Sequence, residues 1–338
     1  MQRINLELTF NDRQCHQKPV SVKVNGVTFV VGNEEFPEWM NVRGGRPMLR
    51  PFMEEIISEL AQTGQARTSE TYRAALGNFL MFREGADIAL ADLNSVVVKR
   101  YERHMLERGL SLNTVSFYMR ILRAAYNRAV ERDMIADRHP FAHVYTGISA
   151  TIKRSVSLEA IRAVKNYGSD QYKRQLARDL FMFSFYTHGM SFVDMAFLRT
   201  DALRKGWLRY HRRKTGQAVH VRWQPCMQDI VKRYRPVEPF MLPIIMCEDG
   251  TEREQYRLVQ NVVNYQLRMI AEELNLGCHL TMYVARHSWA TIAQTMGTPI
   301  EVISGGMGHT NANTTRIYLR APSQNSIDAV NYKIISAL

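Results

Sequence analysis

Apolar residues recur at helical spacing over most of the chain, and changes in this pattern divide the chain into segments. Residues 47–147 predict a helical bundle, because each apolar stripe has the width of one buried helix face and follows a capping signal. We expect about four helices in this domain. Their expected starts are Met48, the Thr68-Ser69 cap, the residues after Asp92, and Ser111 or Asn113.

The residues before the bundle lack the helical spacing of apolar residues. In residues 1–46, short β-type stretches run over Ile4–Leu8, Val20–Val24 and Val27–Val31. Asn25-Gly26, between the second and third stretches, is typical of a hairpin turn. The pattern predicts a β-rich N-terminal arm.

Residues 158–338 predict a second domain, of helices with one small sheet. Two stretches of β-forming residues, Trp207–Arg212 and Ala218–Trp223, flank a turn at 214–217 and indicate an antiparallel hairpin. The polar, basic stretch 148–157 is expected to be the interdomain linker. The expected fold is therefore mostly α-helical and two-domain, a bundle followed by a mixed α/β domain with a small antiparallel sheet.

The stretch from Thr281 to Leu319 predicts short helices joined by tight turns. The first is expected over 285–295 and ends before Gly297, and Thr298-Pro299 gives the second a cap and a proline start. The third helix is expected to carry Tyr318. Beyond it, residues 323–338 have the apolar spacing of an amphipathic tail helix.

Composition narrows the function classes. Hydrophobic residues make up 46% and charged residues 22%, which is typical of a soluble globular protein, and we expect a cytoplasmic one with no membrane segment or signal peptide. The four cysteines form no C-x-x-C pair. A net charge of +12 favours a polyanionic partner, because Lys and Arg release counterions from phosphates. Charge alone leaves that partner open, since many basic proteins bind no nucleic acid.

The candidate chemistry lies in the compact C-terminal stretch. Its tight turns are expected to bring together Arg286, His309 and Tyr318. A cationic fork, an imidazole and a phenol suit phosphoryl transfer in which a tyrosine is the nucleophile.

Three boxes in order, ARHSWAT, GGMGHT and TTRIYL, closely resemble the C-terminal signature of the tyrosine recombinases, or phage-type integrases. The interval from His309 to Tyr318 matches that of the family. The resemblance extends more weakly over about residues 48–338. It implies a core-binding (SAM-like) bundle and a catalytic domain that close around double-stranded DNA as a clamp.

The resemblance also implies an activity. A site-specific recombinase of this family cleaves DNA through a 3′-phosphotyrosyl intermediate, without a cofactor, and serves integration, excision or inversion of mobile elements. Its partners would be DNA recombination sites and further copies of the chain, assembled as a tetramer through the C-terminal tail. Docking of the tail on its own domain remains the alternative and is slightly less favoured. For the N-terminal arm, an accessory DNA contact and simple packing on the next domain both remain open, with packing slightly favoured.

Two boxes depart from the family pattern. GMSFVDMAFL resembles the family's G-x-R-x-x-E-x-x-x-L box, but Ser191 stands where the family has a phosphate-binding arginine. His188 is expected on the same helix face as Ser191 if the helix continues through Gly189, where it would supply part of the missing charge. The alternative, equally favoured, is that His188 only caps the end of the helix. Tyr283 replaces the histidine of H-x-x-R and is expected to orient the phosphate. Integrases of anaerobic gut bacteria look similar at the first of these boxes.

Lys214, in the hairpin turn, matches the lysine that the family uses to protonate the leaving 5′-oxygen. Other side chains are expected to contact DNA phosphates by their position in the bundle or beside Lys214. These residues are Thr68, Lys99, Asn113, Thr114, Arg120, Arg123, Arg212 and Arg213.

Other classes stay open. The departures at Ser191 and Tyr283 also suit a catalytically inactive DNA-binding member of the family, and the chemistry suits a type IB topoisomerase-like enzyme that relaxes DNA. A metal site at His279, His287 and His309 is disfavoured, because no carboxylate or cysteine completes a ligand spacing. His287 is expected to point away from the site.

Overall fold

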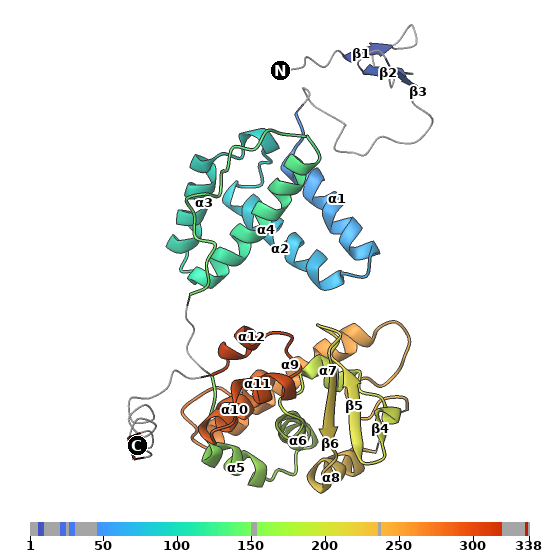
Figure 1. The fold of residues 1–338 in the computed structure, drawn as a ribbon, viewed down its shortest axis with the longest axis vertical. Helices are drawn as coiled ribbons and strands as arrows, with labels where there is room; N and C mark the ends of the chain where they lie inside the picture. Colours follow the sequence, from blue (N-terminus) through green and yellow to red (C-terminus); the bar gives the residue numbers. More distant parts are fainter. Residues whose placement is uncertain are drawn as a thin grey trace. The chain divides into compact units, whose positions relative to one another are not determined.

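The computed structural model describes residues 46–149, 154–235, 238–319 and 335–336, together with the backbone of three N-terminal strands. The chain divides into two compact units, Met1–Ala150 and Thr151–Leu338. Figure 1 shows the helices of each unit and the small sheets.

The N-terminal strands form an antiparallel sheet, as their patterning predicted. They are β1 (Leu6–Thr9), β2 (Ser21–Val24) and β3 (Val27–Val30), in the order β1-β2-β3. Val24 pairs with Leu6 on one side and with Val27 on the other. The proposed DNA contact of this arm stays a prediction.

The bundle consists of α1 (Leu49–Gln62), α2 (Ala66–Phe82), α3 (Ser95–Glu107) and α4 (Leu112–Glu131), with a short 3-10 turn at Leu90–Asp92. Asn94 and Ser111 cap α3 and α4 through their side chains. The expectation that α2 begins at Thr68-Ser69 is wrong, because α2 starts at Ala66 and Ser69 Oγ instead donates to Ile57 O over 2.9 Å. The fully buried side chains of this unit include Phe52, Phe79 and Tyr101.

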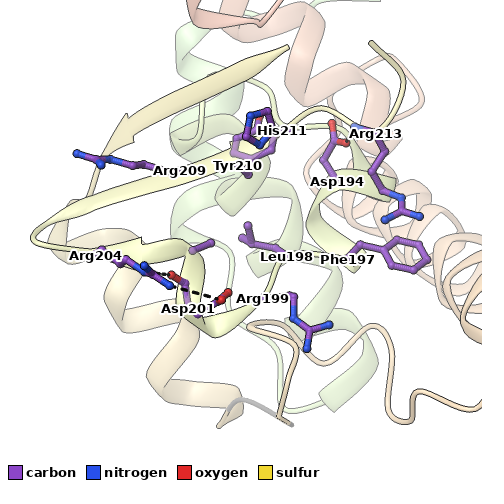
Figure 2. Close-up of a pocket in the computed structure, with 11 residues that line it drawn as sticks. Asp194, Phe197, Leu198, Arg199, Asp201, Arg204, Arg209, Tyr210, His211 and Arg213 are labelled. Atoms are coloured by element: carbon purple, nitrogen blue, oxygen red, sulfur yellow. Dashed lines mark hydrogen bonds and ion pairs between the residues drawn. The ribbon is translucent and has the colours of Figure 1, made fainter. Parts of the chain in front are cut away.

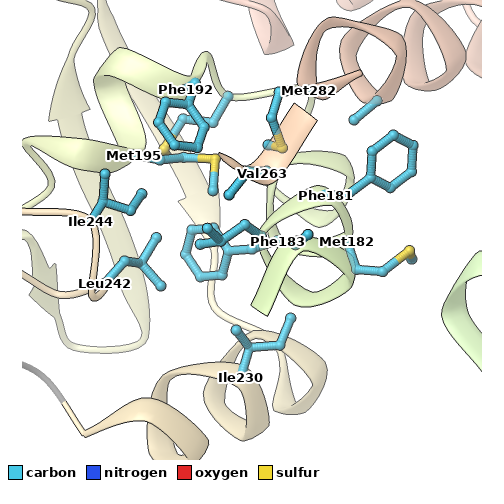
Figure 3. Close-up of a cluster of buried hydrophobic side chains, with 14 of the residues drawn as sticks. Phe181, Met182, Phe183, Phe192, Met195, Ile230, Leu242, Ile244, Val263 and Met282 are labelled. Carbon is cyan, nitrogen blue, oxygen red and sulfur yellow. The ribbon is translucent and has the colours of Figure 1, made fainter. Parts of the chain in front are cut away.

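The second unit is built around α6 (Tyr172–Tyr186), which contacts α5 (Leu158–Asn166), α8 (Pro225–Tyr234), α9 (Glu252–Glu273) and α10 (Met282–Thr295). Much of the circumference of α6 is apolar and buried, as expected for a helix inside a core. Figure 3 shows side chains of α6 among apolar residues of the surrounding elements, such as Ile230 and Val263. This core holds the loops that carry the candidate site.

The sheet of this unit runs in the order β4-β5-β6, with β4 at Leu203–Arg204, β5 at Trp207–His211 and β6 at Ala218–Arg222. Leu208 pairs with Val221 and both are buried, whereas the strand positions beside them are exposed. The hairpin therefore packs one face on the core and exposes the turn at 213–217 to solvent.

The remaining elements are α7 (Phe192–Ala196), a 3-10 turn at Thr200–Ala202, α11 (Ile300–Gly306) and α12 (Ala312–Arg316). Two expected details are wrong. Pro299, not Thr298, is the N-cap of α11, and Tyr318 lies just beyond α12 instead of on it. The tail helix expected over 323–338 lies outside the described residues apart from 335–336. Over the described ranges, no helix is long and apolar enough to cross a membrane.

Candidate active site

Arg286 is the buried centre of the candidate site. It lies on α10 with an exposed fraction of 3%. Nη1 donates to Gly189 O over 2.6 Å, and Nη2 donates to Met307 O over 2.8 Å. Burial, with the charge of Arg212 next in effect, lowers the pKa of Arg286. Backbone carbonyls from two different segments thus fix this guanidinium in place.

Gly189 makes this arrangement possible. Its φ is +74°, and a Cβ at this position would lie only 2.7 Å from Arg286 Cα. Glycine alone combines the left-handed backbone with this close approach.

His309 is held in one tautomer by its partners. Arg286 Nη2 lies 2.8 Å from His309 Nε2, and because arginine only donates, Nε2 accepts. His309 Nδ1 therefore carries the proton and donates to Thr315 Oγ1 over 2.8 Å. Burial first, then the charges of Arg286, Arg212 and Lys214, lower the pKa of His309 to about 4. His309 is a neutral hydrogen-bond acceptor at neutral pH.

The Tyr318 ring lies against His309 and Arg286. Its ring is stacked on His309 with the centroids 5.4 Å apart, and Arg286 Cζ lies 5.6 Å from its centroid. Its backbone carbonyl accepts from Thr291 Oγ1 over 3.1 Å. Its exposed fraction is 8%, so Tyr318 is held by packing and by its backbone.

Tyr283 and His287 complete the cluster from α10. Tyr283 Oη donates to Tyr318 Oη over 2.9 Å. Burial and this hydrogen bond raise the pKa of Tyr283, so its phenol keeps the proton. The His287 ring lies 4.6 Å from the rings of both Tyr283 and Tyr318. The expectation that His287 points away is wrong, and its spacing of one helical turn from Tyr283 was the available signal.

Ser191 and His188 do not lie where the sequence predicted. Ser191 is the N-cap of α7, and its Oγ donates to Asp194 Oδ2 over 2.6 Å. The helix does not continue through Gly189, because α6 ends at Tyr186 and His188 has a φ of +60°. The His188 ring packs at 5.1 Å from Trp289, and burial lowers its pKa. A shared helix face for Ser191 and His188 is therefore wrong.

The hairpin turn places its three basic residues in different surroundings. Lys214 is exposed, and its charge reaches His309, whose pKa it helps to lower. The Arg213 guanidinium lies 3.8 Å from the Phe197 ring centroid. Arg212, expected on the surface beside Lys214, is instead buried, and Nη1 donates to Gly308 O over 2.8 Å.

A pocket of about 410 Å³ lies beside the hairpin, lined by Asp194, Phe197, Arg199, Arg209 and Arg213 among others. Figure 2 shows these side chains around it, with Arg213 directed toward Phe197. Neither Tyr318, Arg286 nor His309 lines this pocket, so it is separate from the tyrosine cluster.

In the bundle, most of the candidate DNA contacts are exposed. Thr68, Lys99, Arg120 and Arg123 lie at the surface. Asn113 and Thr114 are half-buried and bonded within the unit: the Asn113 amide pairs with the backbone of Ser149, and Thr114 Oγ1 bonds Ser111 Oγ. Their DNA contacts stay predictions. Over the described part of the chain, no group of three or more His, Cys, Asp or Glu side chains is placed to hold a metal.

Replacing Gly308 by alanine is expected to damage the site. The φ of Gly308 is +62°, and a Cβ would lie 2.5 Å from Val219 Cγ2 and 2.7 Å from Arg212 Cδ. We expect the free energy of unfolding to fall by about 1–3 kcal/mol. Thermal melting measures this, with Gly305→Ala as the matched control, because a Cβ at Gly305 meets nothing within 4 Å. Equal melting temperatures for the two variants would contradict the close packing.

The lowered pKa of His309 predicts a pH dependence of stability. The unfolded histidine titrates near 6.5 and the folded one near 4, so between these values the unfolded state binds a proton that the folded state does not. The free energy of unfolding is therefore expected to decrease as the pH falls from about 6.5 to about 4. Melting of wild type and His309→Gln at several pH values isolates this effect. If both proteins lost stability equally over that interval, the neutral state of His309 would not explain it.

Two stretches of the chain match known protein families. Residues 48–145 match the phage integrase SAM-like domain, and residues 185–325 match the phage integrase family. No curated protein matches the chain.

Among solved structures, the integrase of the Tn1549 transposon in complex with a circular intermediate DNA shares 14% identity at a TM-score of 0.63, over 83% of this chain and 99% of that one. A lambda integrase dimer bound to a COC' core site shares 13% sequence identity at a TM-score of 0.59, and the match covers 80% of this chain and 95% of that one. A lambda integrase tetramer bound to a Holliday junction shares 13% sequence identity at a TM-score of 0.58, and the match covers 83% of each chain. These likenesses show a common fold.

Proposed function

Because residues 48–145 and 185–325 place this chain in the phage integrase family, we propose that it is a site-specific DNA recombinase whose nucleophile is Tyr318. The observation that carries the proposal is the convergence of Tyr318 with Arg286, His309 and Tyr283. One fixed guanidinium, one neutral imidazole and a second phenol surround the Tyr318 side chain.

The proposed reaction is a transesterification. Tyr318 Oη attacks the scissile phosphorus, forming a 3′-phosphotyrosyl bond, and the bond to the 5′-oxygen breaks. Lys214, exposed in the hairpin turn, gives its proton to that leaving oxygen. Tyr283 keeps its own proton because its pKa is raised, and its hydrogen bond orients the Tyr318 oxygen.

Arg286 stabilises the charge of the reacting phosphate, and His309 accepts a proton. Carbonyl partners hold the Arg286 guanidinium before substrate arrives, so little reorganisation is needed when negative charge develops on the phosphate oxygens. As Tyr318 Oη attacks, its proton passes to Nε2 of neutral His309, which gives up the hydrogen bond from Arg286 to take it, while Thr315 holds the ring through Nδ1. Because the phosphotyrosyl bond conserves the energy of the phosphodiester, strand joining needs neither a metal nor ATP.

Recombination joins strands from two DNA sites, so the proposal includes assembly of several copies on DNA. The similar lambda integrase structures are a dimer on a core site and a tetramer on a Holliday junction, which supports this part of the proposal. A role of the tail at 323–338 in that assembly belongs to the same proposal, as does a DNA contact of the N-terminal arm.

Covalent trapping tests the proposed function. Nicked suicide duplexes made from DNA flanking the gene lose the short 5′-hydroxyl strand after cleavage, so the adduct accumulates and migrates slowly on a denaturing gel. The proposal predicts such an adduct, sensitive to protease. Specific DNA binding without any adduct would instead support an inactive DNA-binding member. Relaxation of supercoiled DNA without need of a second site would support the topoisomerase-like alternative.

A further inference from the structure

Arg212 follows β5, and its side chain enters the interior beside Arg286. Its exposed fraction is 7%. Arg212 Nη1 donates to Gly308 O over 2.8 Å, and the preceding carbonyl, Met307 O, accepts from Arg286 Nη2 over 2.8 Å. Two guanidinium groups therefore bond to consecutive carbonyls of one turn, which brings their charges side by side.

The negative charge near this pair is small. Asp194 Oδ2 lies 3.9 Å from Arg212 Nε, and the same oxygen already accepts from Ser191. His309, which lies 2.8 Å from Arg286 Nη2, is neutral. Within the described ranges, the Nε atoms of both Arg212 and Arg286 are buried without a hydrogen bond. Because buried like charges and unsatisfied donors cost free energy, this arrangement suits a site that receives an anion.

Several residues shape the chain so that Arg212 reaches this place. Asp194 Oδ1 accepts from Arg213 N over 2.9 Å, which anchors the hairpin turn to α7. Gly308 leaves room for the arginine stem, since a Cβ there would lie 2.7 Å from Arg212 Cδ. Ser191, at the start of α7, is neutral and engaged with Asp194. The second positive charge beside Arg286 thus comes from the hairpin.

We propose that Arg212 is a second catalytic arginine, which binds one non-bridging oxygen of the scissile phosphate while Arg286 binds the other. This inference rests on the proposed function, because it requires a phosphodiester that Tyr318 attacks. When phosphorus gains its fifth oxygen, negative charge grows on the two non-bridging oxygens, and pre-positioned guanidinium donors stabilise it. Arg212 forms hydrogen bonds in this step and transfers no proton.

Single-turnover cleavage of nicked suicide duplexes tests the proposal. The proteins are wild type, Arg212→Ala, Arg212→Lys and the control Arg209→Ala, which removes an exposed charge from β5, the strand that precedes Arg212. Arg212→Ala is expected to form the adduct about 10²–10³ times more slowly, and Arg212→Lys to fall between it and wild type. Melting temperatures establish that each variant is folded. If Arg212→Ala does not fold, Arg212→Lys, which retains the positive charge, takes its place in the comparison with wild type.

A second substrate separates catalysis from a structural role. With a methylphosphonate at the scissile position, one charged oxygen is replaced by a methyl group, so less charge needs compensation. The defect of Arg212→Ala is then expected to shrink to about tenfold or less. A wild-type rate for Arg212→Ala on the phosphate substrate overturns the proposal, as does an equal defect on both linkages. If wild type itself forms no adduct with a duplex that it binds specifically, the proposed function fails and the assignment of Arg212 fails with it.

Discussion

Tyr318→Phe is expected to abolish the covalent adduct while leaving the fold and DNA binding intact. The substitution removes only Oη, whose hydrogen bond joins it to the half-exposed Tyr283, so the free energy of unfolding should change by about 1 kcal/mol or less. The rate of adduct formation should fall roughly 10⁶-fold, the scale seen when an enzyme loses its nucleophile. Suicide-duplex cleavage and an electrophoretic mobility shift measure the two properties in the same preparation.

Tyr283→Phe is the matched control for this prediction, because it removes the other hydroxyl of the same hydrogen bond. We expect the control to form the adduct with a loss of about tenfold, which corresponds to one net hydrogen bond. Abundant adduct with Tyr318→Phe and none with Tyr283→Phe would exchange the roles of the two tyrosines.

Arg286→Ala is expected to have the second largest effect and to act in two ways. Gly189 O and Met307 O would each lose a donor in the interior, at a cost of about 1–3 kcal/mol for each unsatisfied group. The adduct should also form about 10²–10³ times more slowly, because the transition state loses its fixed cationic donor. Melting and single-turnover cleavage report these effects separately.

Arg286→Lys distinguishes charge from geometry. A lysine keeps the positive charge but does not donate to Gly189 O, Met307 O and His309 at once in the planar arrangement of a guanidinium. We expect it to recover part of the stability and less of the cleavage rate. Full activity of Arg286→Lys would mean that a point charge is sufficient, and would contradict the role given to the planar guanidinium of Arg286.

The tight C-terminal turns were predictable because their signals are local. Glycine and proline mark the ends of α10 and α11 in the sequence itself, so the approach of His309 and Tyr318 to Arg286 followed from short stretches of chain. The hairpin over β5 and β6 was likewise visible from its β-forming residues. What these signals missed lies within about three residues of the element ends, as at the start of α10, which is Met282 and not residue 285.

The burial of Arg212 was not predictable from local pattern. It depends on the contact of the hairpin with the Gly308 turn, which is distant in sequence, and an arginine in a β-turn normally remains in solvent. The break at His188 has a similar cause, since the chain turns at Gly189 to let Arg286 approach. His287 is different: its helical spacing from Tyr283 placed it on the same side of α10, and that signal was available.

The most direct test of the account is the chemical identity of the residue that holds the DNA. Wild-type adduct, digested with nuclease and trypsin, leaves nucleotide on one peptide that mass spectrometry identifies. Cleavage after Arg316 and Arg320 releases the peptide that contains Tyr318, whereas Tyr283 falls in the peptide that ends at Arg286. The account predicts the nucleotide on Tyr318. Nucleotide on Tyr283, or on any other residue, would contradict it.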